Sequence, residues 1–442
     1  TIPLFLFITA CLILPIRGGL QITPLNPGNV YYSQKPVLNH AATNSFWNFC
    51  FSLDNLSSTK NPYIYFESDT APFEKKTETS QSISILNNKR PNIVLIITES
   101  FTSKVMEYFG EHKDITPYTD SLITHGILFK NFYANGDRTD KGLVSVLSGY
   151  PTQPTDAVIK YPQKTQHLPQ LATELKKYAY YTRFYYGGDA NFASMYSYLN
   201  QGNYNDIIDI QSFSSNERNS KWGFHDHVLL NKMSQDMDTF PQPFFTVCLT
   251  LSNHEPYDTP VEYGSNEGKT DEEKFLNTCK YTDWAIGNFI QSAKDKDWYK
   301  NTLFIIVADH GHSLPGNDDW SSLRKFRIPL IFYGDVLSVQ DSVIETIAMQ
   351  TDIASTLLHQ LGISSVGFNF SENILSPSHP SVAFYTFNNG FGYVCKDGHI
   401  IFDQTSGKPI ESEGNNKQKI DSLGKSYMQK SYSHFLGLQF GL

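Results

Sequence analysis

Side chains that can bind a divalent cation follow three apolar runs of the sequence. The run NIVLIIT is followed by Glu99, and the run LFIIVA is followed by Asp309 and His310. His254 stands just beyond a third run, FFTVCLTL. Continuous apolar runs are typical of strands buried on both faces of a parallel sheet, whose carboxyl ends meet at one edge. The sequence therefore predicts that these carboxylates and imidazoles gather at one edge of a sheet.

The types of these side chains point to metal chemistry. Carboxylate and neutral imidazole groups together are ligands of Zn²⁺ or Mn²⁺, and a catalytic site keeps one position open. Thr139 is a candidate nucleophile for that position, because it lies in a glycine-flanked loop before a helix predicted from Gly142 to Leu147. A threonine hydroxyl is a weak nucleophile, but a bound metal favours its ionised form. Amides at the start of the helix would hold phosphoryl oxygens.

Each of these residues also has a structural interpretation. Thr139 could cap a helix, Asp309 could cap the next helix, and His254 could be a hydrogen-bonded loop residue. His312, in the text DHGH, fits either a residue that contacts the metal ligands or a surface residue. The prediction of a site depends on the co-occurrence of these residues.

Apolar runs that predict strands alternate along the chain with amphipathic segments that predict helices, and these elements would position the candidate residues. The fold class predicted is α/β, a mostly parallel central sheet sandwiched by helices, with a small C-terminal antiparallel subdomain signalled by the hairpin text Asp397-Gly398. Strands are expected at Ile93–Thr98, Thr182–Tyr186, Phe244–Leu251, Leu303–Ala308 and Ile328–Tyr333. Helices are expected at Thr116–Thr124, Leu168–Lys177, Asp271–Lys294 and Gln350–Leu361.

The sequence divides into four parts. Residues 1–17 hold the apolar run IPLFLFITACLILPI, and we expect them to be the end of a transmembrane helix whose beginning precedes this sequence; a cleaved export signal is the alternative. Residues 18–90 are expected to form a juxtamembrane segment and linker, residues 91–375 a catalytic domain, and residues 376–442 a small C-terminal α+β subdomain.

Composition excludes some classes of protein. The net charge is −9 and no basic block occurs, which argues against nucleic acid as a partner. The five cysteines form no C-x-x-C pair, which excludes zinc-finger and thioredoxin motifs.

The motifs taken together resemble a known family. PNIVLIITES, ANGDRTDKG, FYYGGDANF, KWGFHD, LTLSNHEPY and VADHGH occur in the order seen in the lipoteichoic acid synthase-like branch of the alkaline phosphatase and sulfatase superfamily, over about residues 90–334. The resemblance implies an enzyme anchored in the cytoplasmic membrane, with its catalytic domain facing the periplasm or the cell exterior. Such an enzyme takes a phosphoglycerol or phosphoethanolamine head group from phosphatidylglycerol or phosphatidylethanolamine. A phospho-threonine intermediate then passes the group to a glycan or glycolipid acceptor.

The resemblance also assigns roles by position. Glu99, Thr139, Asp309 and His310 match the ligands of one divalent metal ion, Mn²⁺ or Zn²⁺, with Thr139 as nucleophile. His254 matches a histidine that contacts the substrate phosphate or protonates the leaving group. Trp222 and Asp226 of KWGFHD match a motif near the substrate.

The chain departs from the lipoteichoic acid synthases in FYYGGDANFASM. Those enzymes carry a histidine, a tryptophan and an arginine in this region, where the nearest positions here are Tyr186, Ala193 and Met195. The departure argues against polymerisation of glycerol phosphate. The YGGD text is closer to the phosphoglycerol transferases that decorate periplasmic glucans, which implies contacts of Tyr186 and Asp189 with the head group.

Other functions fit the same text less well. A sulfatase needs a cysteine or serine in a C/S-x-P-x-R setting, whereas Thr139 is followed by Asp-Lys-Gly-Leu. A phosphoethanolamine transferase and a metal-dependent phosphate ester hydrolase remain alternatives. A non-catalytic binding protein would be expected to have lost one of the four metal-ligand residues, and all four are present.

Overall fold

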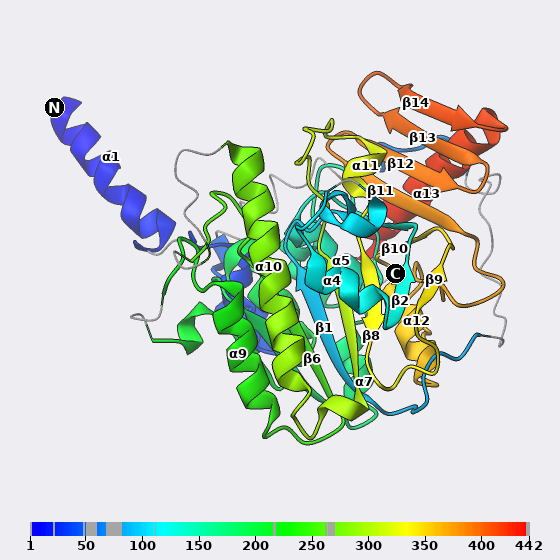
Figure 1. The fold of residues 1–442 in the computed structure, drawn as a ribbon. Coiled ribbons are helices and arrows are strands. Elements are labelled where there is room, and N and C mark those ends of the chain that lie inside the picture. Colours follow the sequence, from blue (N-terminus) through cyan, green and yellow to red (C-terminus); the bar gives the residue numbers. More distant parts are fainter. Residues whose placement is uncertain are drawn as a thin grey trace.

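A mostly parallel sheet of eight strands forms the centre of the protein (Figure 1). The computed structural model describes residues 2–20, 23–46, 49, 60–67, 82–110, 112–214, 218–260, 263 and 270–438. The strand order is β5 (Asp206–Ile208), β4 (Tyr181–Tyr186), β6 (Phe244–Leu249), β1 (Asn92–Thr98), β7 (Thr302–Ala308), β8 (Leu330–Tyr333), β2 (Gly126–Phe129) and β9 (Ser342–Ile344). Only β8 runs against its neighbours, β7 and β2. The predicted fold class is confirmed.

The register of the three central strands brings their carboxyl ends level. Thr98 of β1 lies opposite Ala308 of β7, and Ile97 lies opposite Leu249 of β6. All residues of these three strands are buried, which explains why they read as unbroken apolar runs. The residues that follow each strand therefore emerge side by side.

Helices cover both faces of the sheet (Figure 1). One layer contains α4 (Pro117–Ile123), α9 (Asp226–Met237) and α10 (Asp271–Ala293), and α10 contacts both α4 and α9. The other layer is built around α5 (Thr139–Ser148), α7 (Leu171–Lys176) and α12 (Asp352–Gln360), with α6 (Pro162–Thr165) and α8 (Met195–Gln201) nearby. The long helix α10 begins with a capping box in which Thr270 and Glu273 bond each other's backbone amides.

A second, antiparallel sheet lies at the C-terminal end. It consists of β11 (Val382–Phe387), β12 (Gly390–Cys395), β13 (Gly398–Asp403) and β14 (Lys408–Gly414), and α13 (Lys417–Gly437) packs against β12 and β13. The expected hairpin joins β12 to β13, with Gly398 at a φ of +140°. Two short strands, β3 (Phe132–Tyr133) and β10 (Ala348–Met349), pair in parallel beside β11.

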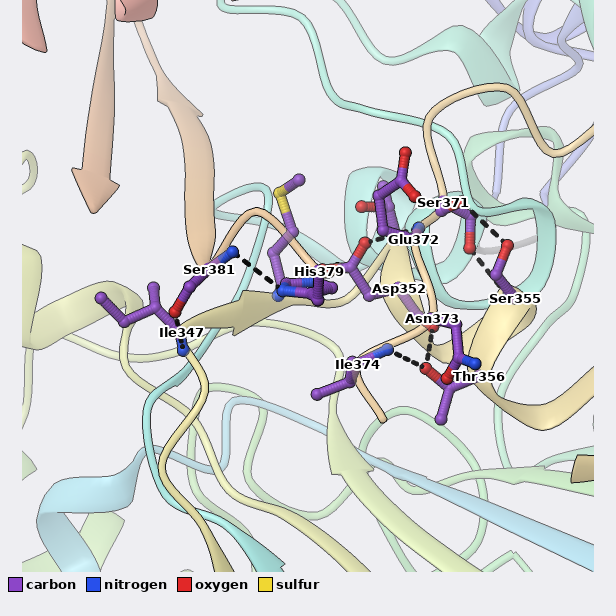
Figure 2. A network of polar contacts seen from close by, with 12 residues as sticks. Ile347, Asp352, Ser355, Thr356, Ser371, Glu372, Asn373, Ile374, His379 and Ser381 are labelled. Carbon is purple, nitrogen blue, oxygen red and sulfur yellow. Dashed lines mark hydrogen bonds and ion pairs between the residues drawn. The ribbon is translucent and has the colours of Figure 1, made fainter. Parts of the chain in front are cut away.

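A buried polar network joins α12 to the chain that leads into β11 (Figure 2). The Asp352 carboxylate accepts hydrogen bonds from the amides of Met349 and Glu372 at 3.0 and 2.9 Å. His379 Nδ1 accepts from the amide of Ser381 at 3.0 Å, so Nε2 carries the proton and faces Asp352 Oδ2 at 3.4 Å. These contacts anchor the antiparallel sheet to the main domain.

The N-terminal helix α1 (Ile2–Arg17) projects from the body with exposed apolar side chains (Figure 1). Within the described part of the chain, no helix combines the length and the apolarity needed to span a bilayer. A short helix, α2 (Pro36–Ala42), follows, and the polar stretch expected as a linker falls partly outside the described residues, at 68–81. Between α1 and α2, Asn26 and Asn29 bond Asn191, in the loop after β4.

Candidate active site

Glu99 is the first residue after β1 and is 3% exposed. Its amide donates to the hydroxyl of Thr250 at 2.9 Å, and its carbonyl accepts from the Asn253 side chain at 3.0 Å. The carboxylate accepts hydrogen bonds from the hydroxyls of Ser100 and Thr139, at 2.9 and 3.0 Å. The loop after β6 thus fixes the backbone of Glu99, and its side chain faces Thr139.

Asp309 and His310 follow β7 on the adjacent strand. Asp309 is fully buried, and its Oδ1 accepts from the amides of Ser100 and His310 at 2.8 and 2.7 Å. Its Oδ2 is buried and has no hydrogen-bond partner among the described residues. His310 Nδ1 donates to the Gly311 carbonyl at 2.8 Å, so in the neutral ring Nε2 would carry the lone pair, and Nε2 faces the two carboxylates. A buried carboxylate oxygen without a partner, and an imidazole whose Nδ1 is held by a backbone carbonyl while Nε2 faces two carboxylates, are features of metal ligands.

Thr139 is the first residue of α5, which begins three residues earlier than expected. The helix approaches β7 closely at Gly142, where an added Cβ would lie 1.8 Å from the Asp309 carbonyl oxygen. Only glycine permits that approach. Gly142 therefore brings the start of α5 against the strand that carries the metal-ligand residues.

The side chains of Glu99, Thr139, Asp309 and His310 lie close to one another. His310 Nε2 lies 3.6 Å from Glu99 Oε1 and 3.4 Å from Asp309 Oδ2. Atoms bound at about 2.0–2.2 Å to one tetrahedral ion lie about 3.3–3.6 Å apart. Glu99, Asp309 and His310 each place a ligand atom within 4.8 Å of the others, and Thr139 joins them through Glu99. The residues therefore fit a single divalent cation.

The electrostatics of the cluster also call for a cation. Burial and the Glu99 charge raise the pKa of Asp309 to about 7. Burial alone would lower the pKa of His310, but Asp309 and Glu99 outweigh it and raise that pKa to about 10. Two buried carboxylates thus hold a positive charge at the imidazole, at the position where a metal ion would provide it.

His254 lies at the rim of this cluster. Its ring is exposed, and it is close enough for its charge to lower the pKa of Glu99. His254 Nδ1 donates to the Glu255 carbonyl at 2.9 Å, and Trp222 packs edge-on against the ring with centroids 5.3 Å apart. The Trp222 indole donates to the same carbonyl at 2.6 Å. Trp222 therefore orients His254.

Asp226, expected near the substrate, is fully buried behind the His254 loop. Its carboxylate accepts from the amides of Leu251 and Ser252 at 2.8 and 3.2 Å and from the Thr282 hydroxyl at 2.8 Å. These bonds fix the loop that carries His254. The geometry thus favours a positioning role for Asp226 over the predicted substrate contact.

Tyr186 and Asp189 lie at the carboxyl end of β4. Tyr186 is buried, and its burial, together with the charges of Glu99, Asp309 and Asp189, raises its pKa. Asp189 is half-buried and accepts from the amide and the side chain of Asn191, both at 3.0 Å. Met195, one of the departures from the lipoteichoic acid synthases, is buried in the core.

His312, for which the sequence allows either a contact with the metal ligands or a surface position, packs against aromatic residues. Its ring stacks on Phe275 with centroids 4.3 Å apart, and its Nδ1 accepts from the Leu314 amide at 3.0 Å. Its Nε2 faces the hydroxyl of Tyr257 at 3.4 Å. Burial and the charge of His310 lower its pKa to about 4, so the ring is neutral. The His312 side chain is therefore held by Phe275 and by the loop that follows it, at Leu314.

Sequence reasoning missed three residues that hold the site together. The buried Gln350 side chain donates to the carbonyls of Ala308 and Asp309, both at 2.7 Å, and accepts from the amide of Asn135 at 2.9 Å. It thus links the end of β7 to the loop that leads to Thr139. Thr250 and Asn253 fix Glu99 in the same manner. No spacing rule predicts such contacts, because each joins a side chain to a distant backbone.

The fold and the cluster define a class: α/β proteins of the sulfatase type, with a metal-ligand set at the carboxyl edge of the sheet. Residues 91–363 match the family model described as Sulfatase, which is more than half of the chain. The chain therefore belongs to the sulfatase family.

Curated relatives confirm the predicted branch. Lipoteichoic acid synthase-like YvgJ of Bacillus subtilis (strain 168) is 23% identical over 404 residues, covering 83% of this chain and 63% of the relative. Phosphoglycerol transferase I of Xanthomonas axonopodis pv. citri (strain 306) is 27% identical over 316 residues, covering 64% of this chain and 43% of the relative. The chain spans about three fifths of the length of the first lipoteichoic acid synthase relatives that it matches.

Solved structures share the fold. A protein of the alkaline phosphatase superfamily from Vibrio parahaemolyticus superposes with a TM-score of 0.70 at 24% identity, over 88% of this chain and 97% of that one. The lipoteichoic acid synthase LtaP from Listeria monocytogenes gives 0.65 at 18% identity, over 80% and 96%. The periplasmic domain of EcEptC from Escherichia coli, in complex with Zn, gives 0.53 at 15% identity, over 74% and 97%.

Proposed function

We propose that this protein is a membrane-anchored, extracytoplasmic transferase that moves a phosphoglycerol group from a phospholipid to a glycan or glycolipid acceptor through phospho-Thr139. The observation that carries the proposal is the convergence of Glu99, Thr139, Asp309 and His310. The names of the curated relatives support the choice of phosphoglycerol. The domain division at 17, 90 and 375 is part of the proposal.

In the first step, Thr139 Oγ1 attacks the phosphorus of the lipid head group, and the bond from phosphorus to the diacylglycerol oxygen breaks. Thr139 already donates its hydroxyl hydrogen to Glu99 Oε2 at 3.0 Å, so the carboxylate holds the proton that the hydroxyl loses. A divalent ion bound by Glu99, Asp309 and His310 would supply positive charge against the developing negative charge. The first amides of α5 lack partners within the helix and would hold phosphoryl oxygens.

His254 protonates the diacylglycerol oxygen as it leaves. Its Nδ1 is engaged with the Glu255 carbonyl, so Nε2 is the atom that meets the substrate. In the second step, an acceptor hydroxyl attacks phospho-Thr139, and the bond from phosphorus to Thr139 breaks. The Thr139 oxygen takes back the proton held by Glu99, and the acceptor's proton passes to His254. We propose that Tyr186 and Asp189 hold the glycerol.

The N-terminal segment supports a lipid donor. The exposed apolar face of α1 suits a bilayer, and we propose that it belongs to a membrane anchor. The chain just after it is bonded to Asn191, which in turn bonds Asp189. The proposed head-group site is thereby held close to the membrane-proximal segment.

Head-group transfer can be followed directly. The membrane-bound protein, loaded with Mn²⁺ or Zn²⁺, is incubated with phosphatidylglycerol or phosphatidylethanolamine labelled in the head group. We expect label to leave phosphatidylglycerol and diacylglycerol to form in equal amount, with Thr139→Ala as the inactive control.

Two other results would change the assignment. Loss of label from phosphatidylethanolamine alone would identify a phosphoethanolamine transferase. Release of label only as free glycerol phosphate, whatever glycan or glycolipid is added, would identify a hydrolase.

A further inference from the structure

Four basic residues surround the start of α5, and they differ in their partners. Lys104 is buried and pairs with Asp318 at 2.7 Å, and Lys141 pairs with Asp137 at 3.1 Å. Arg138 is exposed at the rim. Lys325 is half-buried in α11 (Leu323–Phe326), and within the described part of the chain its ammonium group meets neither a carboxylate at ion-pair distance nor a hydrogen-bond acceptor.

The backbone at Lys325 is fixed between the two loops that form the active site. A Cβ at Gly311, directly after His310, would lie 1.7 Å from the Lys325 carbonyl oxygen. On the other side, the amide of Ala134 donates to the carbonyl of Phe326 at 2.8 Å, in the segment that leads to Thr139. The side chain of Lys325 therefore originates between the metal-ligand loop and the nucleophile loop.

The ammonium group of Lys325 interacts electrostatically with charged groups of the nucleophile loop. Burial raises the pKa of Asp137, but Lys141, Lys325 and His310 outweigh it and leave that pKa lowered. Burial lowers the pKa of Lys325, Asp137 opposes this, and the charges of Lys141, Arg138 and Lys104 lower it further. The charges of Lys325 and His310 thus both act on Asp137.

A half-buried ammonium group without a partner is unfavourable unless an anion compensates it. Its only described contact is the ring of Phe326, with Nζ 5.7 Å from the centroid. A phosphate group on Thr139 would supply the missing anion. We propose that Lys325 is a substrate-binding residue whose ammonium group donates to a non-bridging oxygen of the phosphoryl group being transferred. The role of Lys325 in the transfer reaction rests on the proposed function. The binding of phosphate by Lys325 does not.

The test compares equilibrium binding of inorganic phosphate to the metal-loaded full chain and its variants by titration calorimetry. Removing a charge-assisted hydrogen bond in Lys325→Met is expected to weaken binding about tenfold or more. Lys325→Arg, which keeps the charge, should bind better than Lys325→Met. Arg324→Met changes the exposed neighbour on the same helix and should bind as the wild type does. Metal content by elemental analysis and the Tm should be the same in all four proteins.

Equal phosphate affinities in the wild type and Lys325→Met, or no binding to the wild type, would overturn the assignment. The kinetic arm uses labelled phosphatidylglycerol, where we expect kcat/KM to fall by a similar factor in Lys325→Met. If no form transfers phosphoglycerol while phosphate binding still depends on Lys325, the proposed function fails and the binding residue stands.

Discussion

Thr139→Ala is expected to lose head-group transfer by more than about a thousandfold, because no other group can form the covalent intermediate. The free energy of unfolding should change by no more than about 1 kcal/mol, since the substitution removes one hydrogen bond, to Glu99, at a half-buried position. Transfer is measured with labelled phosphatidylglycerol, and stability by denaturant unfolding.

Thr139→Ser provides the matched control. It keeps a hydroxyl in reach of Glu99 Oε2 and should retain part of the activity. Transfer by Thr139→Ala at the wild-type rate would rule out this residue as the nucleophile.

Asp309→Asn should abolish metal binding at the site. We expect the metal content to fall from about one ion per chain to nearly none. The variant has a neutral carboxamide in place of the carboxylate that would complete the ligand set. Metal at about a hundred times its Kd should stabilise the wild type by about 2.7 kcal/mol and leave the variant unchanged. Without metal, the variant should be at least as stable as the wild type, because burial and the Glu99 charge make the charged Asp309 unfavourable. Elemental analysis and denaturant unfolding with and without metal check these expectations.

A second group of potential ligands offers the control for this experiment. His399, Glu411 and Glu413 on β13 and β14 place ligand atoms within 4.8 Å of one another, but both glutamates are exposed and His399 already pairs with Glu411 at 2.9 Å. Glu413→Gln should therefore leave the metal content unchanged. A loss of metal in Glu413→Gln but not in Asp309→Asn would place the ion elsewhere.

The sequence predicts the central strands and the ligand-type residues that follow them. These strands are buried on both faces, so their residues form continuous apolar runs that can be recognised in the sequence. β1 and β7 match their expected ranges within one residue, and the ligand-type residues follow them directly. One predicted strand is longer than the observed strand. The strand expected to reach Leu251 ends at Leu249, because Thr250 turns its hydroxyl to the amide of Glu99.

Other elements were missed for lack of a local signal. The strands β5 and β9 have three residues each, none of them fully buried, so they carry no apolar run. The helix expected to begin at Leu168 begins at Leu171, just after Pro169. Gln350 could not be recognised, because its contacts with Asn135 and Asp309 exist only when segments far apart in sequence meet.

The phospho-threonine intermediate can be trapped and located on the chain. The metal-loaded protein is mixed with phosphatidylglycerol without acceptor, quenched in acid within the first turnover, and analysed by mass spectrometry of the intact chain and its peptides. We expect a mass increase of one glycerophosphoryl group, located on Thr139 and absent when Asp309 is replaced by Asn. Diacylglycerol release during that turnover without modification of Thr139 would contradict it.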